Sequence, residues 1–395
     1  MHTAPHIHEE KELPLANIAD HLVPVFRANT QEEKEAIYRF RYDVYVTEMQ
    51  RYQNNADHDH GWLKDDDDEA PYSILLYCGT PEKITATARV CIWNAGEIPK
   101  SAQSRLSTHL VPGIDKYNTA EVTRFMVSPS TRGRFLLPSL IIHGYEYLAG
   151  ETGTDLAFFQ SIPALVPHFR RLGTRPYGGA LLDGGSSTLI PSVMVLSDYR
   201  YFKQCGSFLA LFVKKYFFGP DKRKPLNTEK LETIFQDNIV PVELDALRVW
   251  DDVQTDLLKD SDHISNFLDK LSPNIVEEIA KAGMILKVPS GSTLTKEGTI
   301  DRQMYLVLNG KFEVFAQGKS VAILVKGDLF GEMAFFRKEG KRTATVKSVI
   351  DSKVLVISHS SLKKLMHKTP EGALQIFTNI GQIMSDRLAG LLMGG

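Results

Sequence analysis

Short alternating runs of apolar and polar residues, broken at close intervals by glycine, most constrain the fold of the second half of this 395-residue chain. Between Pro289 and Val325 the runs are interrupted by Gly291, Gly298, Gly310 and Gly318. Short strands joined by tight turns are typical of a compact antiparallel barrel. Gly327 then opens a loop ahead of the run Phe330-Gly331-Glu332-Met333-Ala334.

A carboxylate and a guanidinium follow this barrel pattern at a fixed spacing, Glu332 and then Arg342. A guanidinium fork can grip the single charge of a cyclic phosphodiester, while a nearby carboxylate accepts a hydrogen bond from the ribose 2′-hydroxyl. The turn and short helix expected at Glu332 would direct backbone amides at the phosphate. The pattern predicts a cyclic nucleotide site formed by Phe330, Gly331, Glu332, Met333, Ala334, Arg342, Thr343 and Ala344.

With these residues, and with a helical lead-in and a closing amphipathic helix at 374–388, the segment 262–395 resembles the cyclic nucleotide-binding domain family. The resemblance implies that Glu332 contacts the ribose and Arg342 the phosphate. Thr343 stands where a hydroxyl often helps to hold cyclic GMP, so the choice between cyclic AMP and cyclic GMP stays open. A barrel that has lost its ligand is the alternative. Catabolite activators carry a DNA-reading helix-turn-helix after this point, and no room for one is left before Gly395, so no nucleic acid partner is expected.

Composition excludes several other classes of function. Basic and acidic residues nearly cancel, 46 against 48, so no global field recruits nucleic acid or an anionic bilayer. The 3 cysteines are too few for a disulfide framework and fit a reducing compartment. The amino terminus lacks an apolar signal core, and no apolar run approaches the ~18 residues that span a bilayer. We expect a cytoplasmic protein. The apolar segment Phe208–Phe218 could make peripheral membrane contact, although burial is favoured.

The first half alternates helical and strand patterns. Apolar spacing predicts a first helix over 32–46 that presents Arg41. We then expect a hairpin of strands at 72–78 and 84–93 and a third strand at 120–127. A turn at 128–134 leads into a helix at 136–148, which is followed by a strand at 155–159 and a helix at 162–172. Amides of the turn and of the helix start could hold a pyrophosphate or a phosphopantetheine arm.

The order of these elements, with Val127, Pro129, Arg132, Gly133 and Arg134, resembles the Gcn5-related N-acetyltransferase fold. It more closely resembles the acyl-homoserine-lactone and N-acyl amino acid synthases of that superfamily. The features that carry this resemblance are Arg41-Tyr-Asp-Val-Tyr45, the acidic stretch Asp65–Asp68, Arg89, and Glu121-x-x-Arg124 followed by Phe125-Met126-Val127.

The resemblance implies transfer of an acyl group from an acyl carrier protein or coenzyme A thioester to an amine such as an amino acid. The expected donor-binding residues are Met126, Val127, Arg132, Gly133 and Arg134. Two departures from the family pattern disfavour ordinary coenzyme A binding and favour an acyl carrier protein as the donor. The run from Arg132 lacks the second and third glycines that acetyltransferases have in this turn. Phe169 stands where many acetyltransferases place a tyrosine that protonates the leaving thiolate.

Amide formation from a thioester needs a base for the ammonium proton and donors for the oxyanion. Glu121 is the candidate base, and Arg124, Arg89 and Arg41 complete the catalytic set. Glu121 and Arg124 would face opposite sides of a regular strand, so a bulge is needed to bring them together. Three alternatives stay open: a salt bridge between Glu121 and Arg124, arginines that only brace Asp65–Asp68, and a merely solvated Arg41.

No metal site is expected, because 57–60 and the aspartates after it form no complete ligand set and are better explained as an exposed acidic loop. The predicted fold is an α+β mixed-sheet acyltransferase domain followed by an all-β jelly-roll barrel with flanking helices. Its parts are an extension at 1–23, the acyltransferase domain at 24–218, a linker at 219–261 and the nucleotide domain at 262–395. The predicted function is a cyclic-nucleotide-regulated N-acyltransferase. The alternative is a catalytically inactive scaffold that senses cyclic nucleotide.

Overall fold

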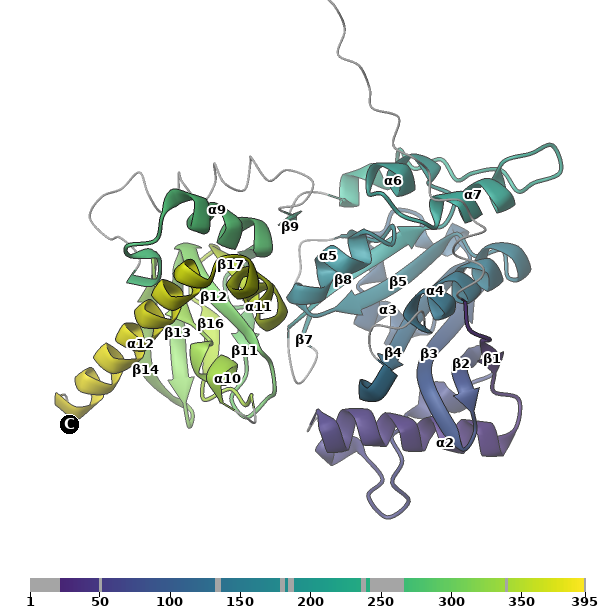
Figure 1. Ribbon diagram of the computed structural model, residues 1–395. Coiled ribbons are helices and arrows are strands. Elements are labelled where there is room, and N and C mark those ends of the chain that lie inside the picture. The colour runs from purple at the N-terminus through teal and green to yellow at the C-terminus, as the bar shows by residue number, and fades with distance from the viewer. Residues whose placement is uncertain are drawn as a thin grey trace, which may run out of the picture.

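The computed structural model describes residues 22–49, 52–131, 136–177, 182–183, 188–235, 239–241, 266–337 and 340–393. These residues build a mixed sheet with helices on both faces and, after it, two facing antiparallel sheets with flanking helices (Figure 1). Residues 1–21 of the expected extension, and 236–238 and 242–261 of the expected linker, lie outside the described residues.

The first domain is organised around an 8-stranded sheet. In spatial order its strands are β1 (Phe26–Arg27), β2 (Ser73–Thr80), β3 (Lys83–Trp93), β4 (Thr119–Val127), β5 (Leu156–Ser161), β8 (Thr188–Val195) and β6 (Arg175–Pro176), with β7 (Leu182–Asp183) paired to β8. Only β4 and β5 pair in parallel among these strands. Because side chains alternate along a strand, Leu76 joins the core on one face while Leu75 and Tyr77 join the core on the other.

Helices cover both faces of this sheet. The helices are α2 (Gln31–Arg41), α3 (Lys100–Leu106), α4 (Leu136–Glu146), α5 (Val166–Arg170), α6 (Tyr199–Gln204) and α7 (Ala210–Phe217). α4 and α7 pack on the face that carries Leu76, whereas α2 and α3 pack on the opposite face. The Phe208–Phe218 segment is largely buried through Phe212, Val213 and Phe217 of α7, which favours burial over membrane contact. No helix among the residues that the structure describes is both long and apolar enough to cross a membrane.

A bulge and a divergence of strands shape the centre of the sheet. The pairing of β3 with β4 shifts between Thr87 and Arg89, and Arg124 opposite this shift has φ 53°. This is the irregularity that the Glu121–Arg124 spacing required. Within the described part of the chain, the parallel ladder between β4 and β5 ends at Glu121 and Phe158, and both strands continue beyond it. An opening between two neighbouring strands is the result.

The second domain consists of two facing sheets of 5 and 4 strands. The larger has the order β15 (Leu329–Phe330), β12 (Gln303–Asn309), β17 (Ser352–Ser358), β10 (Met284–Val288) and β9 (Ile239–Pro241). The smaller has the order β11 (Thr293–Thr295), β16 (Thr345–Ser348), β13 (Lys311–Ala316) and β14 (Lys319–Val325). Alternate residues of β12 serve two cores: Tyr305 and Val307 face the smaller sheet, and Leu306 faces the helices.

Among the described residues, four helices flank these sheets: α9 (Pro273–Ala282), α10 (Glu332–Phe336), α11 (His359–Lys368) and α12 (Pro370–Met393). The closing helix expected near 374–388 is therefore confirmed and is longer at both ends. Its residues Ile376, Ile380 and Ile383 pack on the barrel, whereas Leu388 is 59% exposed.

The two domains meet at an apolar contact. Val166 at the start of α5 and Ile190 of β8 are buried at 1% and 2% exposure in the same cluster as Met284, Leu286 and other core residues of the two facing sheets. The turn at Pro163–Leu165 contacts β10 and β17, and β8 contacts β11. The second domain therefore packs against an edge of the first domain.

Candidate functional site

A network of ion pairs, most of them buried, links α2 to the sheet. Arg41 is fully buried and donates a 2.7 Å hydrogen bond to Asp68, which is 1% exposed. Burial lowers the pKa of Arg41, while the carboxylate of Asp68 opposes that shift. Asp68 also accepts a contact of 3.1 Å from Arg89. Arg41 is thus a structural partner of the acidic stretch, and the alternative of a merely solvated side chain does not hold.

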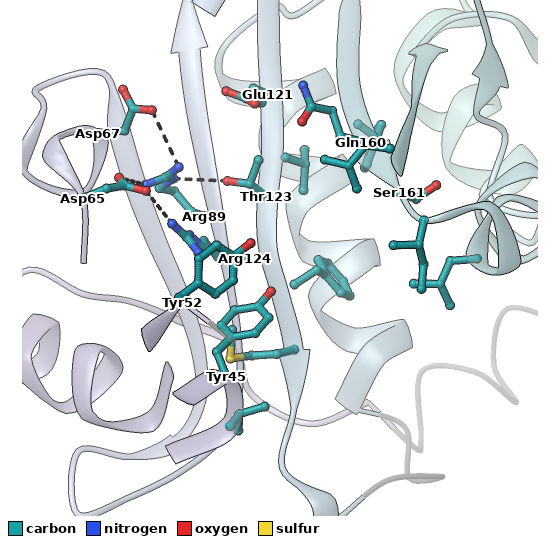
Figure 2. Close-up of a pocket in the computed structure, with 18 of the residues that line it drawn as sticks. Tyr45, Tyr52, Asp65, Asp67, Arg89, Glu121, Thr123, Arg124, Gln160 and Ser161 are labelled. Atoms are coloured by element: carbon teal, nitrogen blue, oxygen red, sulfur yellow. Dashed lines mark hydrogen bonds and ion pairs between the residues drawn. The ribbon is translucent and has the colours of Figure 1, made fainter. Parts of the chain in front are cut away.

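Asp65 extends this network of ion pairs to Arg124 of β4 (Figure 2). It pairs with Arg89, and its second oxygen lies 2.6 Å from Arg124. Burial alone would raise the pKa of Asp65, but Arg89 and Arg124 lower it to about 2. Arg124 lies beside the rings of Tyr45 and Tyr52, at 5.2 Å from the second. The bracing of the acidic stretch by both arginines is therefore present.

Glu121 has a partner that the sequence did not single out. Arg105 of α3 donates from Nε to Oε1 at 3.1 Å and from Nη2 to Oε2 at 2.6 Å, and Nη2 also reaches Asp67 at 3.1 Å. Glu121 is 1% exposed. Arg105 was missed because it lies between two strand patterns and belongs to none of the recognised motifs. Glu121 pairs with Arg105 and Arg124 with Asp65, so a direct bridge between Glu121 and Arg124 is not the arrangement that forms.

The charged residues line a cavity of about 870 Å³ at the opening between β4 and β5. Its wall includes Arg89, Glu121, Arg124, Met126 and Val127, which brings together most of the residues expected for catalysis and donor binding. Arg41 lies behind this wall, in contact with Asp68. The other residues that we expected to bind the acyl donor, Arg132, Gly133 and Arg134, lie outside the described residues.

A second, apolar cavity of about 40 Å³ lies between the sheet and α4. Val122, Phe125, Phe159 and Phe169 border both cavities, so the two adjoin. Gly144 of α4 lines the apolar cavity, and a Cβ built there would have nothing within 4 Å. Phe169, which replaces the tyrosine that acts as a general acid in many acetyltransferases, thus lies between the polar cavity and the apolar one.

The acidic stretch is not the exposed loop that we expected. Residues 57–60 are exposed, but Asp68 is buried and Asp65 and Asp67 are partly buried against arginines. Among the residues that the structure describes, Asp67, Cys91 and Glu121 place potential metal ligands within 4.8 Å of one another. Arg105 bonds both carboxylates of this group, which supplies a positive charge to the place where a cation would bind.

The second site is built around a buried arginine. Arg342 is 4% exposed, and its Nη2 lies 2.8 Å from Asp301, while Nη1 donates to the carbonyl of Gly331 at 3.1 Å. Gly331 has φ 84°, and a Cβ there would lie 2.4 Å from Arg342 Nη1, so only glycine fits. Phe330 stacks on Tyr305 beneath this turn at 4.9 Å. The expected residues around Gly331 and Arg342 are therefore brought together.

Glu332 is tied to the closing helix. Its Oε1 accepts a 2.7 Å bond from Nη1 of Arg387 on α12, and Nη2 of Arg387 donates to the carbonyl of Leu329. Of the other expected residues, Ala334 is buried, Met333 is 41% exposed and bonded by the Thr343 hydroxyl, and Ala344 accepts from Thr295 of β11. Arg387 lies outside the recognised motif, and sequence reasoning missed it.

The chain joins two known kinds of domain. Residues 36–183 match the family model "N-acyl amino acid synthase FeeM", and residues 285–369 match the "Cyclic nucleotide-binding domain" model. The first half thus resembles N-acyl amino acid synthases and the second half resembles cyclic nucleotide-binding domains. A solved structure of FeeM, an N-acyl amino acid synthase from uncultured soil microbes, aligns with 48% of this chain and 97% of its own, at 19% identity and a TM-score of 0.38.

Curated relatives match only part of the chain. The Pycsar effector protein XpPycTIR of Xanthomonas perforans is 26% identical over 113 residues, which is 29% of this chain and 37% of that protein. The cAMP-dependent protein kinase regulatory subunit of Schizosaccharomyces pombe is 34% identical over 91 residues, or 23% of this chain and 22% of that subunit. The chain therefore spans between about a fifth and two fifths of the length of these relatives.

The ion pairs of Asp65 with Arg89 and Arg124 predict that acid lowers the stability of the first domain. The folded pKa of Asp65 lies below its ordinary value of 3.8, so its contribution to stability is present above that value and is lost as the pH falls toward 2. Asp65→Asn should lower the free energy of unfolding at neutral pH and flatten its fall below about pH 5, as measured by urea unfolding. Asp66→Asn, at an exposed neighbour, is the control. An Asp65→Asn protein with the wild-type pH profile would contradict this prediction.

Proposed function

We propose that this chain is a cyclic-nucleotide-regulated N-acyltransferase that moves an acyl group from an acyl carrier protein or coenzyme A thioester to an amine such as an amino acid. The observation that carries the proposal is the pair of adjoining cavities, one lined by charged groups and one apolar, at the opening between β4 and β5. A thioester needs such a place, because its carbonyl requires polar groups and its chain requires an apolar environment.

In this proposal Glu121 accepts the proton of the acceptor's ammonium group. The backbone beyond Glu121 on β4, including Met126 and Val127, leaves the ladder with β5 and can turn amides toward the thioester oxygen. Arg89 and Arg124 hold the acidic stretch that forms the opposite wall. The apolar cavity as it stands has room for only ~3 groups the size of water, so a long chain requires Phe125, Phe159 or Phe169 to turn aside.

The alternative is an inactive scaffold that only senses cyclic nucleotide. The two hydrogen bonds from Arg105 favour it, because they occupy both oxygens of the candidate base. The two proposals predict different products in cells.

Glu121→Gln should abolish product formation, because an amide of the same shape cannot accept the proton. The measurement is mass spectrometry of lipid extracts from cells that overproduce the wild-type chain or the variant. Glu97→Gln, at an exposed glutamate, is the matched control and should retain products. New N-acyl products with the wild type and the control alone would support the enzyme. Equal products with Glu121→Gln would remove Glu121 as the base, and no products from any chain would favour the scaffold.

Gly144→Leu should shift the products toward shorter acyl chains, because the new side chain enters the apolar cavity. Leucine also favours a helix more than glycine by ~1 kcal/mol, so a loss of long chains would not come from a weaker α4. The chain-length distribution in the same lipid extracts measures the effect, with Gly144→Ala as an intermediate. An unchanged distribution would show that the acyl chain lies elsewhere.

Regulation in this proposal begins at Arg342 and Glu332. The guanidinium binds the cyclic phosphate and the carboxylate binds the ribose hydroxyl. The relative named a cAMP-dependent kinase regulatory subunit supports a cyclic nucleotide as the effector. Glu332 must then share its carboxylate between the ribose and Arg387, so the ligand also acts on α12. The base preference stays open between cyclic AMP and cyclic GMP.

The apolar contact between the domains gives the nucleotide site a route to the cavity. The backbone of Arg342 bonds Gly298 and Thr299, which follow β11, and β11 contacts β8. Leu189 of β8 lines the large cavity, and Ile190 next to it is buried against the second domain. A ligand that favours one position of β11 would therefore favour one shape of the cavity wall, with a coupling of typically ~1–3 kcal/mol.

Arg342→Ala should bring the ratio of acyl transfer with and without cyclic nucleotide to one, because the phosphate loses its charge-assisted bonds. Isothermal titration with cyclic AMP and cyclic GMP, beside transfer assays, measures the effect. Arg342→Lys guards against misfolding, since it keeps a charge beside buried Asp301 but loses the fork. Lys341→Ala, at an exposed neighbour, is the control. A wild-type response in Arg342→Ala would show that the effector binds elsewhere.

A further inference from the structure

Arg105 is the exposed member of the pair that it forms with Glu121. Its side chain is 35% exposed and lines the large cavity, whereas the side chain of Glu121 is 1% exposed. Both oxygens of Glu121 accept bonds from Arg105, at 3.1 and 2.6 Å. A molecule that enters the cavity therefore reaches the guanidinium before it reaches the carboxylate.

This order makes the site unfavourable for a simple amine. An ammonium group is repelled by Arg105 and finds the oxygens of Glu121 already in use. A carboxylate is attracted by the same guanidinium, which already shares its Nη2 between Glu121 and Asp67. A guanidinium has five donors in a planar fork, so Arg105 can donate to another carboxylate while its bond to Glu121 or to Asp67 weakens.

We propose that Arg105 binds the carboxylate of the acyl acceptor and, in doing so, frees Glu121 to receive the ammonium proton. The inference rests on the proposed acyl transfer and adds the residue that selects an acceptor whose amine has a carboxylate close to it, as in an α-amino acid. The ammonium then lies beside Glu121 and the carboxylate beside Arg105, so that charges alternate around the four groups. Arg105 is a specificity residue for the acceptor and a positioning residue for Glu121.

The proton balance of the step is complete with these groups. The ammonium gives one proton to Glu121, and its nitrogen forms the new bond to the thioester carbon. Collapse of the tetrahedral intermediate breaks the carbon–sulfur bond, and the departing sulfur takes the second proton from the nitrogen. The products are an amide and a thiol, and Glu121 returns its proton to solvent.

Arg105 could instead only brace Glu121 and Asp67, and matched acceptors separate the two roles. The full chain is assayed for thiol release from dodecanoyl-coenzyme A and a dodecanoyl acyl carrier protein, with cyclic AMP, with cyclic GMP and without either. Each α-amino acid in a panel is compared with its decarboxylated amine. The variants are Arg105→Gln and Arg105→Lys, and Lys100→Gln on the same helix is the control, because Lys100 is exposed.

The wild type and Lys100→Gln should prefer the amino acid by roughly tenfold or more in kcat/KM, equivalent to about 1.4 kcal/mol. Arg105→Gln should lose this preference through a higher KM for the amino acid, while transfer to the amine persists, and Arg105→Lys should retain part of it. A purely bracing role would lower both acceptors equally. A wild-type preference in Arg105→Gln, or an equal loss for both acceptors, overturns the inference alone. No transfer by the wild type to either acceptor overturns the proposed function as well.

Discussion

The pairing of buried arginines with the acidic stretch 65–68 is the interaction on which the first domain depends. Arg41 and Asp68 leave water together, and a buried charge without its partner costs ~3–5 kcal/mol. Because Asp68 also meets Arg89, and Asp65 meets Arg89 and Arg124, the stretch is fixed against β3 and β4 at one place. That place is the wall of the large cavity, so the same charges that hold α2 to the sheet also define the space where a substrate would lie.

Much of this arrangement could be predicted from short motifs. The arginines at 41, 89 and 124 and the aspartates were identified from the resemblance to acyl-homoserine-lactone and N-acyl amino acid synthases. The odd offset between Glu121 and Arg124 required the bulge that the structure contains. Arg105 could not be predicted, because its role depends on how α3 folds back over β4, which no local pattern states. Strand β8 and the division of the first helix at Arg41 into α2 and a π-helical turn, Tyr42–Glu48, were also missed.

The second domain was easier to predict, because its glycines carry geometric information. Gly331 takes φ 84° directly against Arg342, so the sequence run and the buried arginine specify each other. The pairing of Glu332 with Arg387 was harder, since it joins residues that are far apart in sequence through the packing of α12. Local motifs identified the groups that we propose to contact the nucleotide, whereas tertiary packing decides which side chains those groups pair with.

The burial of Val166 and Ile190 among barrel residues has a consequence for dissecting the chain. A fragment that ends before the second domain would present these two aliphatic side chains to water, next to the turn that borders the cavity. Such a fragment should self-associate or lose order at that edge, and its behaviour would not report that of the first domain in the intact molecule. Chimeras that exchange the second domain for another domain would need to supply a matching apolar surface at the same edge.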